Sequence, residues 1–207
     1  MEPRGSRVWP SRLASQATSR PAGRGASAMA QLLADFDTAH CGAVRDAQLD
    51  SLGQCLATAS ADGHVRLWDL RKPEDPRFLT DLGGHEGGVE QVAWAPPEVG
   101  VLLASAGSDG CVLVWGRKSA PGEWHVVHRE DLKRHGAVLS VAWAPAGHGA
   151  VLACASDDGT VTVLAHQGVL RSGEATVEHR WERQPFQAQR GPVHAVSWAP
   201  AASFSDR

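Results

Sequence analysis

Short stretches of alternating apolar and polar residues recur along the chain, in the period-2 pattern of a strand with one buried face. The three clearest are His64–Trp68, Cys111–Trp115 and Thr160–Leu164, and each directly follows an Asp-Gly pair. An Asp-Gly pair between two β-like runs is typical of a hairpin with a type I′ turn, which needs positive φ at both central residues. The pattern therefore predicts strands joined by tight turns rather than helices.

Two phrases recur in one register, which indicates an internal repeat. The first ends in the Asp-Gly pairs that begin at residues 62, 109 and 158. The second is Val-Ala-Trp-Ala-Pro or Val-Ser-Trp-Ala-Pro; it contains Trp94, Trp143 and Trp198, and Leu49 holds the same slot earlier in the chain. Because proline cannot continue a ladder, each second phrase ends a strand. Units of about 40–50 residues with four short strands are typical of β-propeller blades.

The repeat predicts an all-β fold, a partial β-propeller with about three four-stranded blades and the start of a fourth. The expected units are residues 31–70, 77–116, 123–165 and 177–200, within an incomplete propeller domain over residues 29–207. So few blades would leave unpaired strand edges on both sides, which is an aggregation risk. We therefore expect a truncated product, a splice form or an incomplete gene model.

Residues 1–28 form an extension of a different kind, rich in Arg, Ser, Ala and Gly and without an apolar period. It holds five arginines and one acid, and Pro3, Pro10 and Pro21 interrupt it. Such a composition cannot bury enough apolar surface to fold, so disorder is predicted. Two alternatives stay open, an organelle transit peptide and an upstream extension translated ahead of Met29.

Composition argues against several classes of function. The chain carries 20 Lys and Arg against 23 Asp and Glu, and its acidic excess lies after the extension, which disfavours nucleic-acid binding. Four scattered cysteines without a CxxC pair indicate neither a disulfide framework nor a zinc site. His125 and His128 would lie on opposite faces of a strand. Without a nucleophile elbow or a phosphate loop, we expect no catalytic residue, metal or cofactor, and no enzyme.

The repeats resemble the WD-repeat signature, in which a His, a Ser or Thr, the turn Asp and the strand Trp hydrogen-bond in a chain inside each blade. The resemblance assigns this structural role to His40, Thr58, Asp62 and Trp68 in the first unit, to His85, Ser105, Asp109 and Trp115 in the second, and to His135 and Asp158 in the third. The third unit departs from the pattern, because Cys154 replaces the hydroxyl and Leu164 replaces the tryptophan. A complete network is not expected there, so packing must hold that blade.

Finer phrases resemble the Sec-thirteen family of WD-repeat proteins over about residues 31–202. The matching phrases are Asp37–His40, Asp46–Asp50, Asp81–Gly87 and Gln91–Pro96, together with the departures of the third unit. The resemblance implies a non-catalytic scaffold subunit of the COPII vesicle coat, in ER-to-Golgi transport, and of the nuclear pore complex.

The same resemblance implies three partners: a Sec-thirty-one-like coat protein, a helical-solenoid nucleoporin of the Y complex and a GATOR-type nutrient-sensing complex. The expected locations are the cytoplasmic face of the endoplasmic reticulum membrane, COPII vesicles, the nuclear envelope and the lysosomal membrane, with membrane association through partners only. A generic WD-repeat adaptor that binds peptides or proteins in signalling or ubiquitin-ligase complexes is the alternative.

The propeller of that family has six blades and is open, and a partner inserts a seventh blade beside the first. On this chain the resemblance places the partner-blade edge at residues 31–38, with Leu32, Leu33 and Phe36 as candidate contacts. A simpler alternative is that this predicted strand merely completes the sheet of its own blade.

Overall fold

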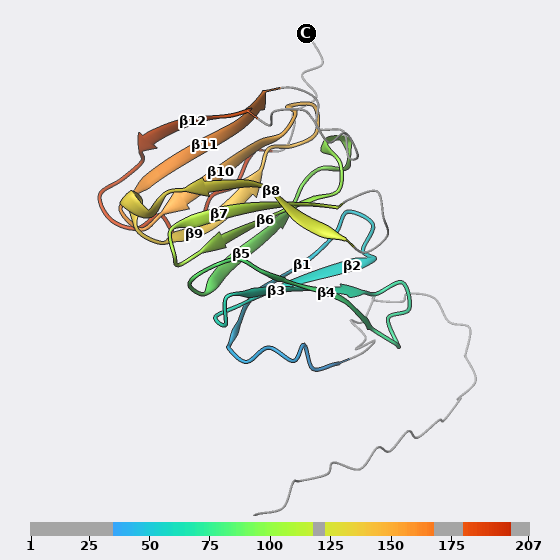
Figure 1. Ribbon diagram of the computed structural model, residues 1–207. Coiled ribbons are helices and arrows are strands. Elements are labelled where there is room, and N and C mark those ends of the chain that lie inside the picture. The colour runs from blue at the N-terminus through green and yellow to red at the C-terminus, as the bar shows by residue number, and fades with distance from the viewer. Residues whose placement is uncertain (1–34, 118–122, 168–179, 200–207) are drawn as a thin grey trace, which may run out of the picture. The chain divides into compact units, whose positions relative to one another are not determined.

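Three four-stranded antiparallel sheets make up the described part of the chain, residues 35–117, 123–167 and 180–199 of a computed structural model (Figure 1). Sheet 1 contains β1 (Val44–Leu49), β2 (Cys55–Ser60), β3 (His64–Asp69) and β4 (Arg77–Gly83). Sheet 2 contains β5 (Val89–Trp94), β6 (Leu102–Gly107), β7 (Cys111–Arg117) and β8 (Trp124–Asp131). Sheet 3 contains β9 (Val138–Trp143), β10 (Val151–Ser156), β11 (Thr160–Gln167) and β12 (Arg180–Gln187). The predicted all-β fold is confirmed.

Each sheet is a meander, in which strands that follow one another in sequence lie side by side. The last strand of each sheet belongs to the next sequence unit, so that units and sheets are offset by one strand. Two short 3-10 helices, η1 (Pro97–Val99) and η2 (Lys133–His135), lie in loops. The described residues all belong to one compact unit, residues 33–207, and the extension over residues 1–28 lies outside them.

The three Asp-Gly hairpins form, but the predicted type I′ turn is wrong. At the first of them the Gly63 N–H donates to Ser60 O at 3.2 Å, and of the turn residues only the glycine has a positive φ, at 87°. Three residues thus connect the strands, as in a type I turn followed by a left-handed glycine. Asp62 precedes the glycine because its Oδ1 accepts the His64 N–H at 3.1 Å. The same turn recurs at the other two pairs.

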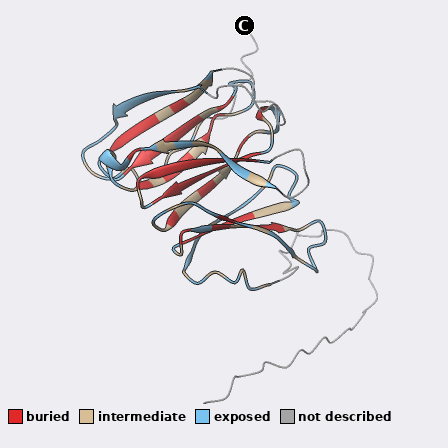
Figure 2. Cartoon of the chain, in the orientation of Figure 1, coloured by how far each residue is buried: buried red, intermediate tan, exposed pale blue. Residues whose placement is uncertain are grey.

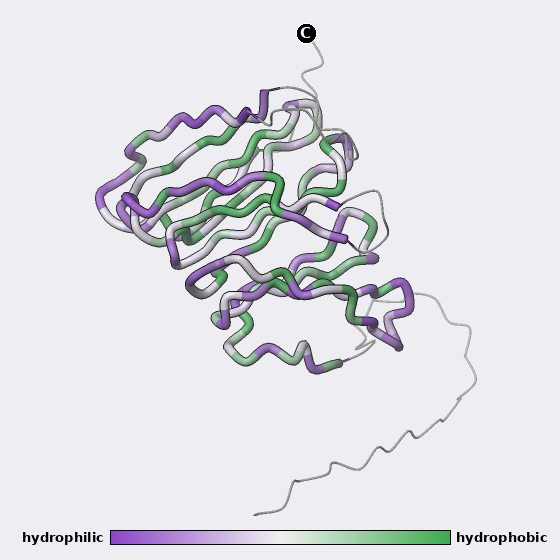
Figure 3. The backbone as a smooth tube through the Cα atoms, viewed as in Figure 1, coloured by the Kyte–Doolittle hydropathy of each residue, from purple (hydrophilic) through white to green (hydrophobic). Residues whose placement is uncertain are grey.

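The apolar cores lie between neighbouring sheets. Successive residues of β6 and β7 face sheet 1 and sheet 3 in turn, so these strands are buried almost throughout (Figure 2). Leu103 and Leu113 join the cluster shared with sheet 1, whereas Val112 and Val114 join the cluster shared with sheet 3. Burial on both faces explains the continuous apolar runs in sheet 2, in contrast to the exposed and largely hydrophilic β12 (Figure 3).

Residues 192–199 follow sheet 3 without forming the strand that the third Trp-Ala-Pro phrase predicts. No described strand pairs with them, and so no ladder forms. They are held instead by single bonds to sheet 3, including Val193 N–H to Ser156 O at 3.2 Å and the Trp198 indole to Ala142 O at 2.9 Å. The segment therefore occupies the place of a first strand beside sheet 3.

Candidate functional site

A complete hydrogen-bonded chain lies on the face of sheet 2 that is turned toward sheet 1. The Trp115 indole Nε1 donates to Ser105 Oγ at 2.9 Å, Ser105 Oγ lies 2.8 Å from His85 Nε2, and His85 Nδ1 lies 3.1 Å from Asp109 Oδ1. Burial lowers the pKa of His85 more than Asp109 raises it, so the ring is neutral at pH 7. Nδ1–H then donates to the aspartate and Nε2 accepts the Ser105 hydroxyl proton, which satisfies every member.

On sheet 1 the chain is shorter than the sequence predicts. His40 Nδ1 lies 3.0 Å from Asp62 Oδ2, and its Nε2 lies 2.9 Å from Thr58 Oγ1. The Trp68 indole Nε1, however, is buried without a hydrogen-bond partner. Thr58 Oγ1 is directed toward Arg66 O at 3.3 Å instead. Assigning Trp68 to this chain was therefore wrong, and its ring is held by packing.

On sheet 3 the two replacements limit the chain to one contact. His135 Nδ1 lies 2.7 Å from Asp158 Oδ2. Cys154 and Leu164 are fully buried in the cluster shared with sheet 2. Burial, helped by the charge of Glu130, raises the pKa of the Cys154 thiol, which stays protonated and apolar in character. Packing thus replaces the polar chain on this sheet.

The turn aspartates bear their negative charge in a well-bonded environment. Burial alone would raise the pKa of Asp62, but hydrogen bonds from His40 and from the backbone N–H groups of His64 and Cys41 outweigh it. The pKa of this carboxyl consequently lies well below its usual range. Backbone bonds and a histidine lower the pKa of Asp109 against the same opposing effect of burial.

These pKa shifts predict a fold that loses stability toward acid in two steps. The folded state binds fewer protons than the unfolded state at both His85 and the aspartates, so stability rises with pH. We expect the first loss below about pH 6.5, from His85, and a second below about pH 4, from the carboxylates. Urea unfolding between pH 3 and 8 measures both. His85→Gln should flatten the first step, whereas the exposed control His125→Gln should not; equal flattening would contradict the assignment.

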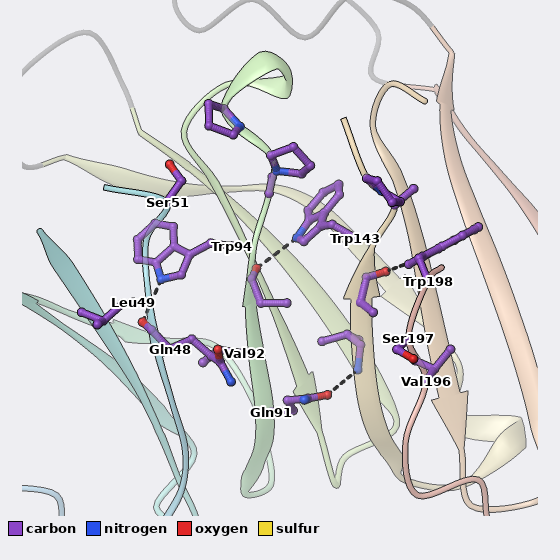
Figure 4. A pocket seen from close by; sticks show the side chains of 18 residues that line it. Gln48, Leu49, Ser51, Gln91, Val92, Trp94, Trp143, Val196, Ser197 and Trp198 are labelled. Carbon is purple, nitrogen blue, oxygen red and sulfur yellow. Dashed lines mark hydrogen bonds between the residues drawn. The ribbon is translucent and has the colours of Figure 1, made fainter. Parts of the chain in front are cut away.

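Neighbouring sheets are joined by a repeated pair of hydrogen bonds that the sequence analysis did not anticipate. The tryptophan of each Trp-Ala-Pro phrase donates its indole N–H to a carbonyl on the first strand of the preceding sheet (Figure 4). These bonds join Trp94 to Gln48 O at 2.9 Å, Trp143 to Ala93 O at 3.0 Å and Trp198 to Ala142 O at 2.9 Å.

The second bond of each pair comes from the valine two residues before the tryptophan. Its backbone N–H donates to a side-chain oxygen on the preceding first strand. These bonds join Val92 to Asp46 at 3.1 Å, Val141 to Gln91 at 2.7 Å and Val196 to Ser140 at 3.1 Å. We call the two bonds the inter-sheet clamp. Its only sequence signal is a polar residue directly before the phrase, at positions 46, 91 and 140.

The clamped strands line a pocket of about 490 Å³ (Figure 4). That volume falls in the range of small-ligand sites. The indole N–H groups on its walls, however, are engaged in the clamp, and so is the Gln91 carbonyl oxygen. Across the described ranges, no group of three or more His, Cys, Asp or Glu could hold a metal ion. We therefore interpret the pocket as the space between strands that the clamp joins.

The free face of sheet 1, which is the face turned away from sheet 2, lacks the donor half of this clamp. Leu49 stands in the tryptophan position there and is 52% exposed. Ala47 stands in the valine position, and its N–H donates to the neighbouring Asp46 Oδ1 at 2.8 Å. At the two clamp positions, a sheet that docked on this face would thus meet neither an indole donor at Leu49 nor an unpaired N–H at Ala47.

An aromatic cluster covers another part of this free face. The Trp68 ring centroid lies 4.9 Å from that of Phe36 and 5.4 Å from that of Phe78, which is 53% exposed. Phe36 is the one predicted edge residue inside the described ranges, since Leu32 and Leu33 lie outside them. Residues 35–38 form no strand, and the fourth strand of sheet 1 is β4.

A polar group pins the segment before β1 to the same face. The Arg66 guanidinium donates through Nη1 to Thr38 O at 2.9 Å and through Nε to Asp81 Oδ2 at 3.1 Å. His64 Nδ1 lies 2.6 Å from the other oxygen of Asp81. The free face of sheet 1 thus combines exposed apolar side chains with an anchored polar rim, which is the composition of many protein-binding surfaces.

Comparison with known proteins gives concordant results. The family model "WD domain, G-beta repeat" matches residues 31–69, 76–116 and 126–163. Protein transport protein SEC13 of Coccidioides immitis is 38% identical over 179 residues, which cover 84% of this chain and 54% of that protein. A SEC13 homolog of Dictyostelium discoideum is 43% identical over 46% of this chain and 31% of its own length.

The chain thus spans about half or less of the length of these relatives. The crystal structure of Saccharomyces cerevisiae Sqt1 shares the fold, with a TM-score of 0.59 and 18% identity over 76% of this chain and 38% of that one. Among the residues with described structure, neither helix has the length and apolarity that a membrane crossing requires.

Proposed function

The chain belongs to the WD-repeat family, and from its similarity to SEC13 proteins we propose that it acts as a non-catalytic scaffold in protein transport, as a subunit of the COPII coat. SEC13 and other WD-repeat proteins of this kind are structural and not enzymatic. The name protein transport protein, carried by the Coccidioides relative, supports the transport role.

The observation that carries the proposal is the free face of sheet 1. Each described sheet-to-sheet contact uses a tryptophan donor, yet this face offers Leu49 in its place and satisfies Ala47 locally. Such a face suits a partner that brings its own blade and binds through apolar contact. We place a blade donated by a Sec-thirty-one-like coat protein there, with Leu49, Phe36 and Phe78 as the contact residues.

We propose the nuclear pore role, which the family resemblance implies, for the same face. A helical-solenoid nucleoporin that donates a blade would use the same face, so the two partners would exclude each other. The peptide-adaptor alternative finds less support. The indole N–H groups on the walls of the pocket between the clamped strands are already engaged in the clamp.

Co-expression of the full chain with the blade-forming segment of a Sec-thirty-one-like protein tests the proposal. We expect a one-to-one complex on size-exclusion chromatography. Phe78→Glu and Leu49→Asp should each weaken binding about tenfold or more, since they place a charge in a desolvated apolar contact. Phe186→Glu is the matched control, because Phe186 is 54% exposed but lies on sheet 3. Loss of binding in Phe186→Glu with full binding in Phe78→Glu would refute the assignment.

A further inference from the structure

The interface between sheets 2 and 3 contains a recognition element made by the last strand of each sheet. On β8, His128 stacks against Trp181 of β12, with ring centroids 4.9 Å apart and an interplanar angle of 21°. Two residues further along β8, Glu130 Oε1 accepts a hydrogen bond from Arg183 Nη1 at 3.0 Å. Two positions on one strand thus contact two positions on the other.

Glu130 lies in a position where the loss of its ion-pair partner Arg183 would be costly. Its side chain is only 12% exposed, and its second oxygen lies 3.2 Å from His128 Nε2. Hydrogen bonds from His128 and Arg183 lower its pKa despite burial, so the carboxylate is charged at neutral pH. If Arg183 were absent, a largely buried negative charge would keep only the histidine as a partner.

The interface between sheets 1 and 2 is apolar at the same positions. The strand pairings align Leu82 with Glu130, because Val65 pairs with Leu82 and the equivalent Val112 pairs with Glu130. Leu82 is buried in the cluster shared by sheets 1 and 2.

The partner position differs in the same way. Leu164 pairs with Arg183, and Trp115, which is its equivalent in sheet 2, pairs with Val126. Two residues before Val126 and Arg183, the equivalent positions hold Trp124 and Trp181, so both strands carry a tryptophan there. Leu82, which is buried in the first interface, and Val126, which is 42% exposed, thus correspond to a glutamate and an arginine at the second interface.

Repeated sheets with similar faces can dock in the wrong order or onto a second copy of the chain. The Glu130–Arg183 pair is only partly buried, since Arg183 is 47% exposed and Glu130 is 12% exposed. Such a pair contributes little net stability, but loss of Arg183 would take one of its partners from a largely buried carboxylate. If sheet 3 docked on the face of sheet 1 that sheet 2 normally covers, Arg183 would meet Leu82. If a second copy's sheet 2 docked on sheet 2, Glu130 would meet Val126.

We infer that Glu130 and Arg183 are specificity-determining residues that make sheet 3 dock on sheet 2 and reject the other sheet faces of the same chain or of a second copy. The pair sets the order of the sheets, and His128 and Trp181 add a stacked aromatic contact beside it.

Four variants of the full chain test this role. E130R and R183E should each lower the equilibrium constant for folding about threefold or more and raise the oligomeric fraction, since each brings two like charges together beside the largely buried position 130. The swap E130R/R183E should restore most of the folding equilibrium constant and bring the oligomeric fraction most of the way back to that of the parent. The decisive variant is E130L/R183V, which copies the first interface; we expect its urea midpoint to match the parent but its oligomeric fraction to exceed the parent's at equal concentration.

Size-exclusion chromatography with light scattering measures the oligomeric fraction, and urea titration measures stability. An E130L/R183V variant that is as monomeric and as stable as the parent would overturn the inference, because the pair would then be dispensable for order. A swap variant as unstable and as oligomeric as E130R or R183E alone would also overturn the inference. In that case the two residues would not act through their contact with each other.

Discussion

Replacing Trp143 with alanine is expected to lower the free energy of unfolding by about 3–5 kcal/mol. The indole is buried in the cluster shared by sheets 2 and 3, and its centroid lies 6.3 Å from that of Trp181. Alanine would leave a cavity between the sheets and also remove the clamp bond to Ala93 O, worth about 1 kcal/mol. Urea unfolding followed by far-ultraviolet circular dichroism measures the loss without relying on tryptophan emission.

Two related variants separate the contributions. Trp143→Phe keeps most of the buried ring but lacks the indole donor, so it should cost clearly less than the alanine variant. Trp198→Ala should also cost less, because residues 192–199 form no ladder and Trp198 is only partly buried. A Trp198→Ala loss as large as that of Trp143→Ala would contradict this ranking, because both indoles make the clamp bond and only their burial differs.

His85→Ala should lower the free energy of unfolding by about 2–4 kcal/mol, because it removes one hydrogen-bond partner from the buried Asp109 carboxylate and one from the buried Ser105 hydroxyl. The matched variant is His135→Ala on sheet 3. There Asp158 is more than one-third exposed and no hydroxyl completes the chain, so we expect about 1 kcal/mol or less.

The same urea titrations at pH 7 compare the two histidines. Similar losses for both would show that the polar chain on sheet 2 stabilises no more than an isolated surface contact. A much larger loss for His85→Ala would support the view that completeness of the chain determines its contribution.

Much of the fold is predictable from the sequence because its signals are local and repeated. Asp-Gly pairs mark the hairpins, and Trp-Ala-Pro phrases mark the ends of β5 and β9. The predicted turn type was wrong because Asp62 accepts the His64 N–H with its carboxylate, in a turn where only the glycine has a positive φ. The strand predicted before Trp198 does not form, because no described strand pairs with residues 192–199.

The candidate site was less predictable, since it depends on residues far apart in sequence. Each clamp bond joins residues separated by 46, 50 or 56 positions, and no local pattern connects a polar residue at one repeat to a valine at the next. Trp68 matches the strand tryptophan of the WD-repeat pattern, but its indole N–H does not make the hydrogen bond that Trp115 makes in sheet 2. A bulge opposite Leu67 and Trp68 sets the local register, and the rings of Phe36 and Phe78 pack on the indole.

Hydrogen–deuterium exchange of the full chain, with and without the blade-forming segment of the coat partner, tests the central claim most directly. Docking on the free face of sheet 1 predicts new protection in β1 and in residues 35–43, with β12 unchanged. Protection confined to β12 and residues 192–199, with β1 exchanging as in the free chain, would contradict the proposed binding face.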